Sequence, residues 1–232
     1  MNLGAPMRVA IIGASGKMGT RLVRESLERG HEVVAVCRPS SVDKLDEFGE
    51  RDGFTVLSAP VVSDEATLTR ALAGCDAAVA ILISVRRLKA TALVSSLARA
   101  TAANGVKRLA FTAGEVTAVR EAGETFTARQ RLLLAVARVI SWFTPYSVND
   151  MVKSSELVRQ QADWEWTIVR APTLRDTPAV GYRFCEISEV AASHVLSRAD
   201  YASCLLDVLV SDEHRRRTLT VVPAAGAVLG RA

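Results

Sequence analysis

Three glycines near the start of the chain, Gly13, Gly16 and Gly19, have the spacing of a turn that binds a dinucleotide. Such glycines allow a sharp turn, a close approach of backbone to a pyrophosphate and tight packing of a helix on a sheet. An apolar run, residues 8–13 (RVAIIG), precedes the turn, and a segment of helical period follows it. Because the first N–H groups of a helix attract phosphate, we expect a dinucleotide to be held by Gly13, Ser15, Gly16, Lys17, Met18 and Gly19.

The end of the second apolar run, residues 31–37, bears on which dinucleotide binds. An NAD site usually has a carboxylate there for the ribose 2′-hydroxyl, whereas the 2′-phosphate of NADP needs a cation. This chain has Arg38 at that point, followed by Ser40, Ser41 and Lys44, and no carboxylate at the strand tip. We therefore expect NADP(H), with Arg38 on the 2′-phosphate. An arginine there can also be only a surface residue, so NAD(H) stays open.

The elements that must position this turn follow from the alternation of short apolar runs with longer stretches of helical period. The expected strands are 8–13, 31–37, 54–57, 76–84, 106–112, 165–170 and 218–222, and the expected helices are 17–29, 64–72, 88–104, 148–161 and 198–209. This order predicts an α/β fold. It is one doubly wound Rossmann-type domain over residues 1–232, with a parallel sheet and helices on both faces.

Two irregular segments, 114–147 and 172–192, each follow an expected strand. Both leave the carboxyl edge of the sheet, where doubly wound folds bind ligands, so we expect them to form the substrate side. Within the first, residues 131–143 (RLLLAVARVISWF) have a wide apolar stripe if they are helical. Such a stripe must be buried somewhere. An added core helix, a lid over a hydrophobic substrate and a dimer surface all stay open.

Composition and charge exclude several classes of function. The formal net charge is only +4, and the one dense basic cluster is 215–217, so we expect no nucleic-acid partner. The four cysteines lie far apart without a CxxC pair, which predicts neither a metal site nor a disulfide framework. No signal-peptide pattern and no apolar stretch of membrane-spanning length is evident, so we expect a soluble, cytoplasmic protein without a membrane partner.

Taken together, these segments resemble the atypical short-chain dehydrogenase/reductase group. Within that group the likeness is to the NAD(P)H-binding branch of NmrA-like proteins and biliverdin-IXβ/flavin reductases. The resemblance covers nearly the whole chain and is carried by VAIIGASGKMG, ALAGCDAAVAIL, GVKRLAFTAG, WTIVRAPTLRD and SRADYASCLLDVL. The first of these stretches is specific for a cofactor, and the others mark the fold and the branch.

The resemblance implies roles at matching positions. Ile83 and Ser84, after the fourth strand, would border adenosine and its ribose. Thr112, at the tip of the fifth strand, would face the nicotinamide and the substrate. Lys153 matches the lysine of the family's YxxxK pair, which holds the nicotinamide ribose. The residues that would lie beside the nicotinamide carboxamide are Ala171, Pro172 and Thr173.

The tyrosine of the YxxxK pair is replaced in this chain by Asn149. An asparagine amide can donate a hydrogen bond, but it cannot relay a proton. Tyr146 lies seven residues before Lys153, nominally on the same helical face, and is a candidate catalytic substitute. Alternatively, Ser147 and Asp150 form a capping box, which would make Tyr146 a packing residue. Lys153 could likewise be a surface lysine paired with a carboxylate of its own helix.

The favoured function is that of an NADPH-dependent reductase, with a carbonyl, bilin or flavin-like molecule as hydride acceptor. A flavin or bilin acceptor needs no strong protein acid, so the missing tyrosine is then tolerable. The alternative is a non-enzymatic, NmrA-like sensor that binds NADP(H) and acts through a protein partner, and an epimerase is a third possibility. We expect a hydrophobic or aromatic small-molecule substrate and a monomer or homodimer. Glu115 and His194 are further candidates for substrate contact, and Asp176 is expected to be structural.

Overall fold

The order of the strands in the central sheet reverses beside the glycine turn. The computed structural model describes residues 5–85, 88–117 and 123–224. Its main sheet has eight strands in the order β3-β2-β1-β4-β5-β6-β10-β8. β1 (Arg8–Ile12) pairs in parallel with β2 (Glu32–Cys37) on one side and with β4 (Ala77–Ala80) on the other. The order therefore reverses between β1 and β4, which is where doubly wound sheets bind ligands.

The rest of the sheet is parallel except at one edge. Four strands extend it by parallel pairing, namely β3 (Phe54–Ser58), β5 (Arg108–Gly114), β6 (Glu165–Ala171) and β10 (Arg217–Pro223). β8 (Tyr182–Cys185) pairs antiparallel with β10 at the edge. β7 (Thr173–Arg175) and β9 (Val195–Ser197) form a separate parallel pair. The expected Rossmann-type sheet is thus confirmed, and the segment expected to be irregular after residue 171 contains β7 and β8.

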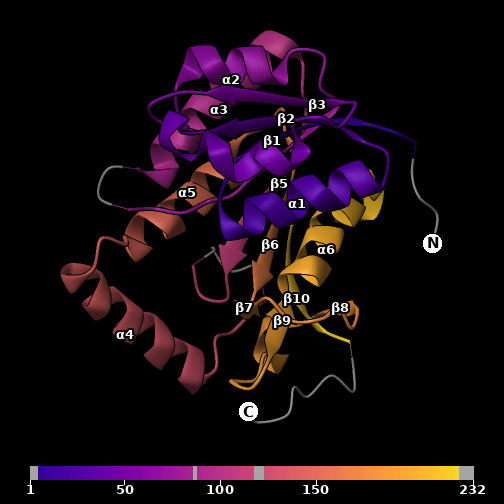
Figure 1. The fold of residues 1–232 in the computed structure, drawn as a ribbon. Helices are drawn as coiled ribbons and strands as arrows, with labels where there is room; N and C mark the ends of the chain where they lie inside the picture. The colour runs from indigo at the N-terminus through magenta and orange to yellow at the C-terminus, as the bar shows by residue number, and fades with distance from the viewer. Residues whose placement is uncertain (1–4, 86–87, 118–122, 225–232) are drawn as a thin grey trace.

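Helices cover both faces of the sheet (Figure 1). One face carries α1 (Lys17–Glu28) and α6 (Arg198–Val210), and the other carries α2 (Glu65–Leu72), α3 (Ala90–Asn104) and α5 (Val148–Gln160). Alternate side chains of β1 enter two different cores, Val9 and Ile11 on the α1 side and Ala10 and Ile12 on the α3 side. Since both faces are covered, β1 is a continuous apolar run rather than an alternating one.

Helix ends fall where the capping residues predict them. Asp64 precedes α2, and its carboxylate accepts a hydrogen bond of 2.8 Å from the Thr67 N–H. Gly30, just beyond the end of α1, and Gly105, which ends α3, have positive φ angles of 79° and 71°. Glycine adopts this left-handed conformation without steric cost, so both helices stop at the predicted positions.

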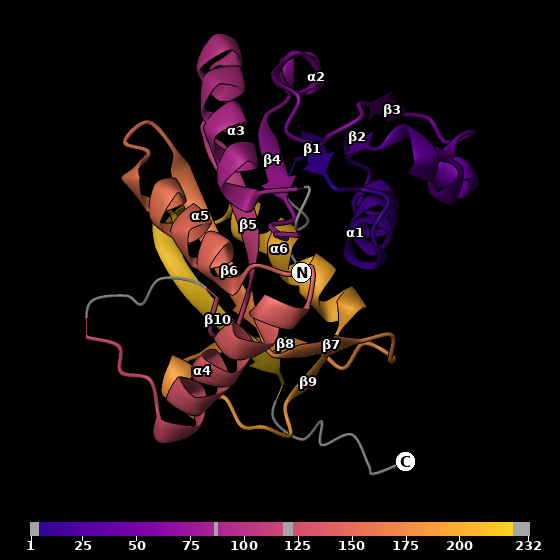
Figure 2. The ribbon, with the colours of Figure 1, turned by 90° about the vertical axis from the view of Figure 1, so that its left-hand side faces the viewer.

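α4 (Ala128–Phe143) extends away from the layered body in Figure 1, and in Figure 2 it lies nearest the viewer at the lower end of the molecule. Thr127 begins it with a capping box, in which its hydroxyl accepts from the Gln130 N–H and the Gln130 side chain accepts from the Thr127 N–H. The stripe within residues 131–143 is therefore helical, as its period indicates. The interpretation of this stripe as an added core helix is wrong, because its large apolar side chains are exposed. Within the described ranges no helix is long and apolar enough to cross a membrane.

Candidate cofactor-binding site

The glycine turn joins β1 to α1 in a shape that depends on glycine. Gly13 has a φ angle of 90°. A Cβ atom on Gly19 would overlap the Gly13 carbonyl oxygen and lie 2.5 Å from the Ala14 carbonyl oxygen. The N–H groups of Gly13 and Ala14 both donate to the Val36 carbonyl, at 2.9 and 3.1 Å, and so fasten the turn to β2. Any larger residue at position 19 must therefore push the turn away from the helix.

The start of α1 offers hydrogen-bond donors to an anion. Gly16 is the N-cap, no side chain caps the helix, and its first turn holds no acidic residue. The leading N–H groups of a helix have no partner within the helix, and together they form the positive end of its dipole. Gly16 and Lys17 both line the cavity described next. A pyrophosphate fits this end of the helix.

A cavity of about 900 Å³ opens beside the turn. The six turn residues expected to hold a dinucleotide all line it, namely Gly13, Ser15, Gly16, Lys17, Met18 and Gly19. Its other residues come from the segments that follow β2, β3 and β4, and also from β7 and α6. The cavity thus crosses the sheet at the reversal between β1 and β4, where the strand order predicts a ligand.

The charge of the cavity wall is positive. Lys17, Arg38, Lys44 and Arg198 line it, and no carboxylate is among its described lining residues. Arg198 makes an ion pair of 2.8 Å with Asp176, whereas the other three cations have no ion-pair partner in the described parts of the chain. An uncompensated cluster of cations attracts a ligand with several negative charges.

Hydroxyl groups stand beside the cations at the end of β2. Arg38 directly follows β2, and η1, a 3₁₀-helical segment (Pro39–Phe48), begins at the next residue. Ser40, Ser41 and Lys44 of this segment line the cavity together with Arg38. Guanidinium, ammonium and hydroxyl groups at one point form a donor set for a phosphate monoester. No described residue places a carboxylate in the wall, as a free ribose 2′-hydroxyl would require.

Two apolar walls face the same cavity. One consists of Pro60, Val61 and Val62, which follow β3, and the other consists of Ile81, Ile83, Val85 and Leu88, which follow β4. Val61 and Ile83 are 45% and 41% exposed, unusually open for apolar residues beside a cavity. A flat apolar ring such as adenine would cover this surface. Ile83 thus lines the cavity, and its contact with adenosine stays a prediction.

Ser84 does not line the cavity but anchors its wall. Its side chain is fully buried, and its hydroxyl donates to Asp150 Oδ2 at 2.7 Å. The same carboxylate accepts from the Thr91 hydroxyl at 2.7 Å and the Ala90 N–H at 2.8 Å. Burial by itself would raise the pKa of Asp150, but these hydrogen bonds outweigh it and lower that pKa. Asp150 therefore ties the segment after β4 to α3 and α5.

The capping box expected at the start of α5 is half present. The Ser147 hydroxyl accepts from the Asp150 N–H at 3.4 Å, so Ser147 is the N-cap. The Asp150 carboxylate does not return the bond, because it binds Ser84, Ala90 and Thr91 instead. The neighbouring Tyr146 is half-exposed and forms an isolated antiparallel bridge with Val85 of the cavity wall.

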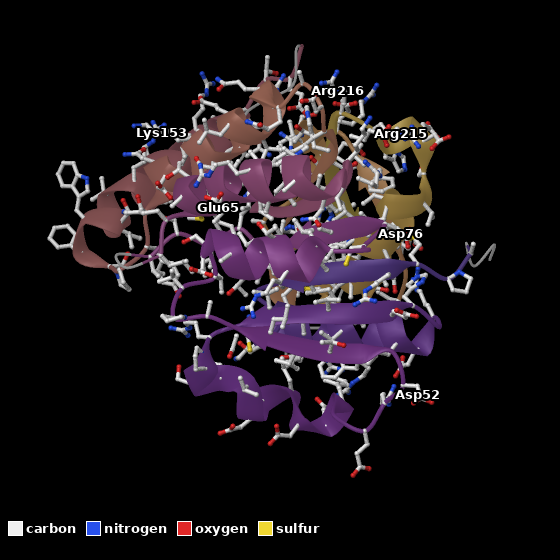
Figure 3. The ribbon with its side chains drawn as sticks, turned by 90° about the horizontal axis from the view of Figure 1, so that it is seen from above. Asp52, Glu65, Asp76, Lys153, Arg215 and Arg216 are labelled. Atoms are coloured by element: carbon white, nitrogen blue, oxygen red, sulfur yellow. The ribbon has the colours of Figure 1, made fainter. Side chains whose placement is uncertain are left out.

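The residues expected on the nicotinamide side lie outside the lining of this cavity. Thr112 is buried near the end of β5, and its Oγ1 accepts a hydrogen bond of 3.0 Å from the Leu82 N–H. Lys153 is an exposed residue of α5 and extends from the surface of that helix (Figure 3). Asn149 is exposed as well. None of the expected catalytic residues Thr112, Lys153 and Tyr146 is thus among the residues that line the cavity.

Residues after β6 are only partly in contact with the cavity. Ala171 is buried, Pro172 is half-buried and Thr173 is exposed, and none of the three lines it. Their neighbour Leu174, in β7, does line it, as does Arg198 at the start of α6. The sequence interpretation missed both. The sequence offers one local indication for each. Leu174 comes shortly after β6, and Arg198 is the first residue of α6.

Two further candidates have structural partners. Glu115 accepts a hydrogen bond of 3.0 Å from Gln130 Nε2 and makes an ion pair with Arg129, so it holds the start of α4. His194 Nδ1 accepts from the Ala191 N–H at 3.2 Å within a local turn. Neither side chain is a free acid at the cavity. Among the described residues there is also no group of three side chains that could hold a metal ion.

Known proteins share both the sequence pattern and the fold. A family model described as NAD(P)H-binding matches residues 13–212. The uncharacterized protein YwnB of Bacillus subtilis (strain 168) is 28% identical over 94% of this chain and 100% of its own. A short-chain dehydrogenase/reductase from Veillonella parvula DSM 2008, solved in complex with NADP, superposes with a TM-score of 0.73 at 16% identity over 96% of both chains. ChuY, an anaerobilin reductase from Escherichia coli O157:H7, does so with a TM-score of 0.70 at 16% identity, over 97% of this chain and 100% of its own. Both solved structures are thus similar to this chain in fold.

Proposed function

The chain belongs to the NAD(P)H-binding family, and from this premise we propose that it is an NADPH-dependent reductase that transfers hydride to a hydrophobic or conjugated acceptor. The observation that carries the proposal is the cavity wall beside the glycine turn, with four cations and no carboxylate among its described residues. A dinucleotide with a 2′-phosphate is the ligand of this family that best matches such a wall.

Each part of the cavity would hold one part of NADPH. The turn and the start of α1 would bind the pyrophosphate, with Lys17 and Arg198 as further cations. Arg38, with the hydroxyl groups after it, would bind the 2′-phosphate, and the two apolar walls would enclose the adenine. The Veillonella parvula protein of similar fold, which was solved with NADP, supports this assignment.

On the nicotinamide side, the chain would orient the reactants rather than donate a strong acid. Bound NADPH would supply the hydride. Because Thr112 Oγ1 accepts its hydrogen bond from the Leu82 N–H, the Thr112 hydroxyl keeps its own hydrogen to donate toward an acceptor. Lys153 would contact the nicotinamide ribose only if its exposed side chain turns inward.

The missing tyrosine favours a conjugated acceptor. Asn149 stands at the family's tyrosine position and cannot relay a proton, and Tyr146 pairs through its backbone with Val85. A bilin or flavin accepts hydride into a conjugated system and can take its proton from solvent, whereas a simple ketone needs a proton at its oxygen in the same step. The fold shared with an anaerobilin reductase supports a bilin-like acceptor.

The test is a turnover screen with the purified protein. NADPH oxidation would be followed with flavins, bilins and quinones, and with simple ketones as a comparison set. We expect turnover with a conjugated acceptor and none with the ketones. Tight NADPH binding without turnover on any acceptor would overturn the proposal that the protein is a reductase. That result would favour the second candidate, a nucleotide sensor that acts through a protein partner, for which the absent tyrosine is the supporting observation.

A further inference from the structure

α4 exposes an apolar side that nothing in the described chain covers. Leu132, Trp142 and Phe143 are 66%, 76% and 82% exposed. Four more of its large apolar side chains are also exposed, namely Leu133, Val136, Val139 and Ile140. Monomeric proteins rarely expose apolar patches larger than a few hundred Å², and larger ones mark interaction sites. The side chains of this helix therefore indicate a contact with another molecule.

The exposed residues form a seam with the period of helix–helix packing. The less exposed positions of α4 are 129, 130, 134, 137 and 141. The last four share one side of the helix, so this side faces the body. Leu132, Val136, Val139 and Phe143 have the same four-three-four spacing on the opposite side. Apolar residues at alternating intervals of four and three are the pattern by which one helix packs along another. The seam thus points away from the rest of the chain.

Polar contacts at the start of α4 fix its direction. Gln130 is fully buried, and its Nε2 donates to the Ile187 carbonyl at 2.5 Å and to Glu115 at 3.0 Å. Arg129 donates to the Val190 carbonyl at 2.7 Å. These bonds to buried groups would all have to break for the helix to roll its seam inward. α4 is consequently a fixed arm with its apolar side outward.

We propose that the seam of α4 packs against the same seam of a second copy of this chain, in a two-fold symmetric dimer. A two-fold contact brings one patch onto itself, so an apolar seam is self-complementary. The four seam residues and the exposed side chains beside them, Leu133, Ile140 and Trp142, present on the order of 800 Å² together. This is about the area that each partner contributes to a standard interface. The inference does not rest on the reductase function.

Two other occupants fit the seam less well. A lid would direct its apolar side toward the cavity, but no residue of α4 lines that cavity. A helix that lies on a membrane has its charged face opposite the apolar one. Here the opposite positions are Gln130, Leu134, Ala137 and Ser141, and they face the body.

The test compares oligomeric states in solution. Mass would be measured by light scattering and sedimentation for the wild type, for Val139→Glu in the middle of the seam, and for Val210→Glu as the control. Val210 is 47% exposed on α6, close to the 53% of Val139, and lies outside the seam. We expect a wild-type dimer, a dimer with Val210→Glu, and at least a hundredfold weaker dimerisation with Val139→Glu. Circular dichroism would verify that each variant folds.

Three outcomes would overturn the proposal. The first is a wild type that stays monomeric at every concentration. The second is a folded Val139→Glu variant that dimerises as tightly as the wild type, which would place the interface elsewhere. The third is a monomeric wild type that floats with vesicles of phosphatidylcholine and phosphatidylserine, while Val139→Glu does not, which would assign the seam to a membrane surface.

Discussion

Gly19 and Arg38 serve the same cavity in different ways, one by leaving space and the other by supplying charge. Gly19 lets the start of α1 approach the turn after β1, since any Cβ would collide with two carbonyl oxygens. Arg38 adds a cation at the end of β2 that has no ion-pair partner among the described residues. Under the proposed function, Gly19 would decide whether a pyrophosphate can bind, and Arg38 would decide which ribose is preferred.

Replacement of Gly19 by alanine should weaken binding of either dinucleotide. The added Cβ overlaps the Gly13 carbonyl oxygen, so the turn must move and the phosphate donors lose their alignment. We expect at least a tenfold rise in Kd for NADPH, with a lower Tm, measured by calorimetric titration and thermal melting. Gly49→Ala is the matched control, because a Cβ there lies at 3.4 Å from the Asp46 carbonyl oxygen and has room. Unchanged Kd in Gly19→Ala would contradict this account of the turn.

Replacement of Arg38 by aspartate should weaken the binding of NADPH but not that of NADH. A charge-assisted contact to the 2′-phosphate is worth about 1.5–3 kcal/mol, which is roughly a ten- to hundredfold change in Kd. We expect this loss for NADPH and little change for NADH, by the same titration. The control is Arg51→Asp, which alters another exposed arginine outside the cavity lining. If Arg38→Asp binds NADPH as the wild type does, another group holds the 2′-phosphate.

Residues at the site differed in how far they could be predicted. The turn and Arg38 were predictable because their signal is local, a glycine spacing and one residue after a strand. Leu174 and Arg198 could not be predicted, because the crossing of distant segments brings them to the cavity. Ser84 was expected to border adenosine, but it is buried outside the cavity lining. Its bond to Asp150 joins residues 66 positions apart, which no local pattern shows.

The segment after β4 shows how one element positions another. It carries Ile81, Ile83 and Val85 of the cavity wall. Asp150, near the start of α5, binds it through Ser84, and the Ser147 N–H donates to the Ser84 carbonyl at 3.0 Å. α5 therefore supports this wall of the cavity from behind, and no described residue of α5 lines the cavity itself.

Asp150→Asn should loosen this support. An amide cannot accept all the hydrogen bonds of the carboxylate, and lost or unsatisfied buried bonds cost about 1–3 kcal/mol. We expect that decrease in the free energy of unfolding, measured by urea denaturation at pH 7, together with weaker NADPH binding. Asp163→Asn, at an exposed aspartate before β6, is the control.

The contribution of Asp150 to the free energy of unfolding should also depend on pH. The pKa of Asp150 lies below its usual value, so the folded state binds this proton less readily than the unfolded state, where the pKa is about 3.9. The resulting stabilisation is present above about pH 4 and is lost as the pH falls through the folded-state pKa. The stability difference between wild type and Asp150→Asn should therefore narrow in acid. A difference that stays constant down to full acid unfolding would exclude an ionised Asp150.

α4 shows what the spacing of apolar residues can and cannot predict. The spacing of its apolar residues predicted a helix, and a helix is present at Ala128–Phe143. The same spacing could not tell which surface covers the stripe, because a core, a lid and a partner all require apolar residues. The short strands β7 and β8 escaped prediction for a related reason, since they are half-exposed and lack a continuous apolar run.

At the scale of the whole molecule, alternation of strands and helices was enough to predict the fold. Right-handed crossovers turn that alternation into a sheet whose order reverses between β1 and β4. The antiparallel edge strand β8 follows no such rule and was not predicted. The cavity at the reversal joins segments from residue 13 to residue 198, so a bound dinucleotide would hold together most of the chain.

A ligand that joins so much of the chain should stabilise the whole of it. With free NADPH at about a hundred times its Kd, the free energy of unfolding should rise by about 2.7 kcal/mol. For a chain of this size that corresponds to a rise in Tm of roughly 5–10 °C. Differential scanning calorimetry would measure it. An unchanged Tm at saturating NADPH would show that the cavity does not bind the dinucleotide in the folded state.

The most direct test of the central claim is the ratio of two dissociation constants. Wild-type protein would be titrated with NADPH and with NADH in the same buffer, by calorimetry. The uncompensated cations at the end of β2 and the absence of a carboxylate from the described cavity wall predict that NADPH binds at least tenfold more tightly. Equal affinities, or tighter binding of NADH, would contradict the assignment of this cavity to NADP(H).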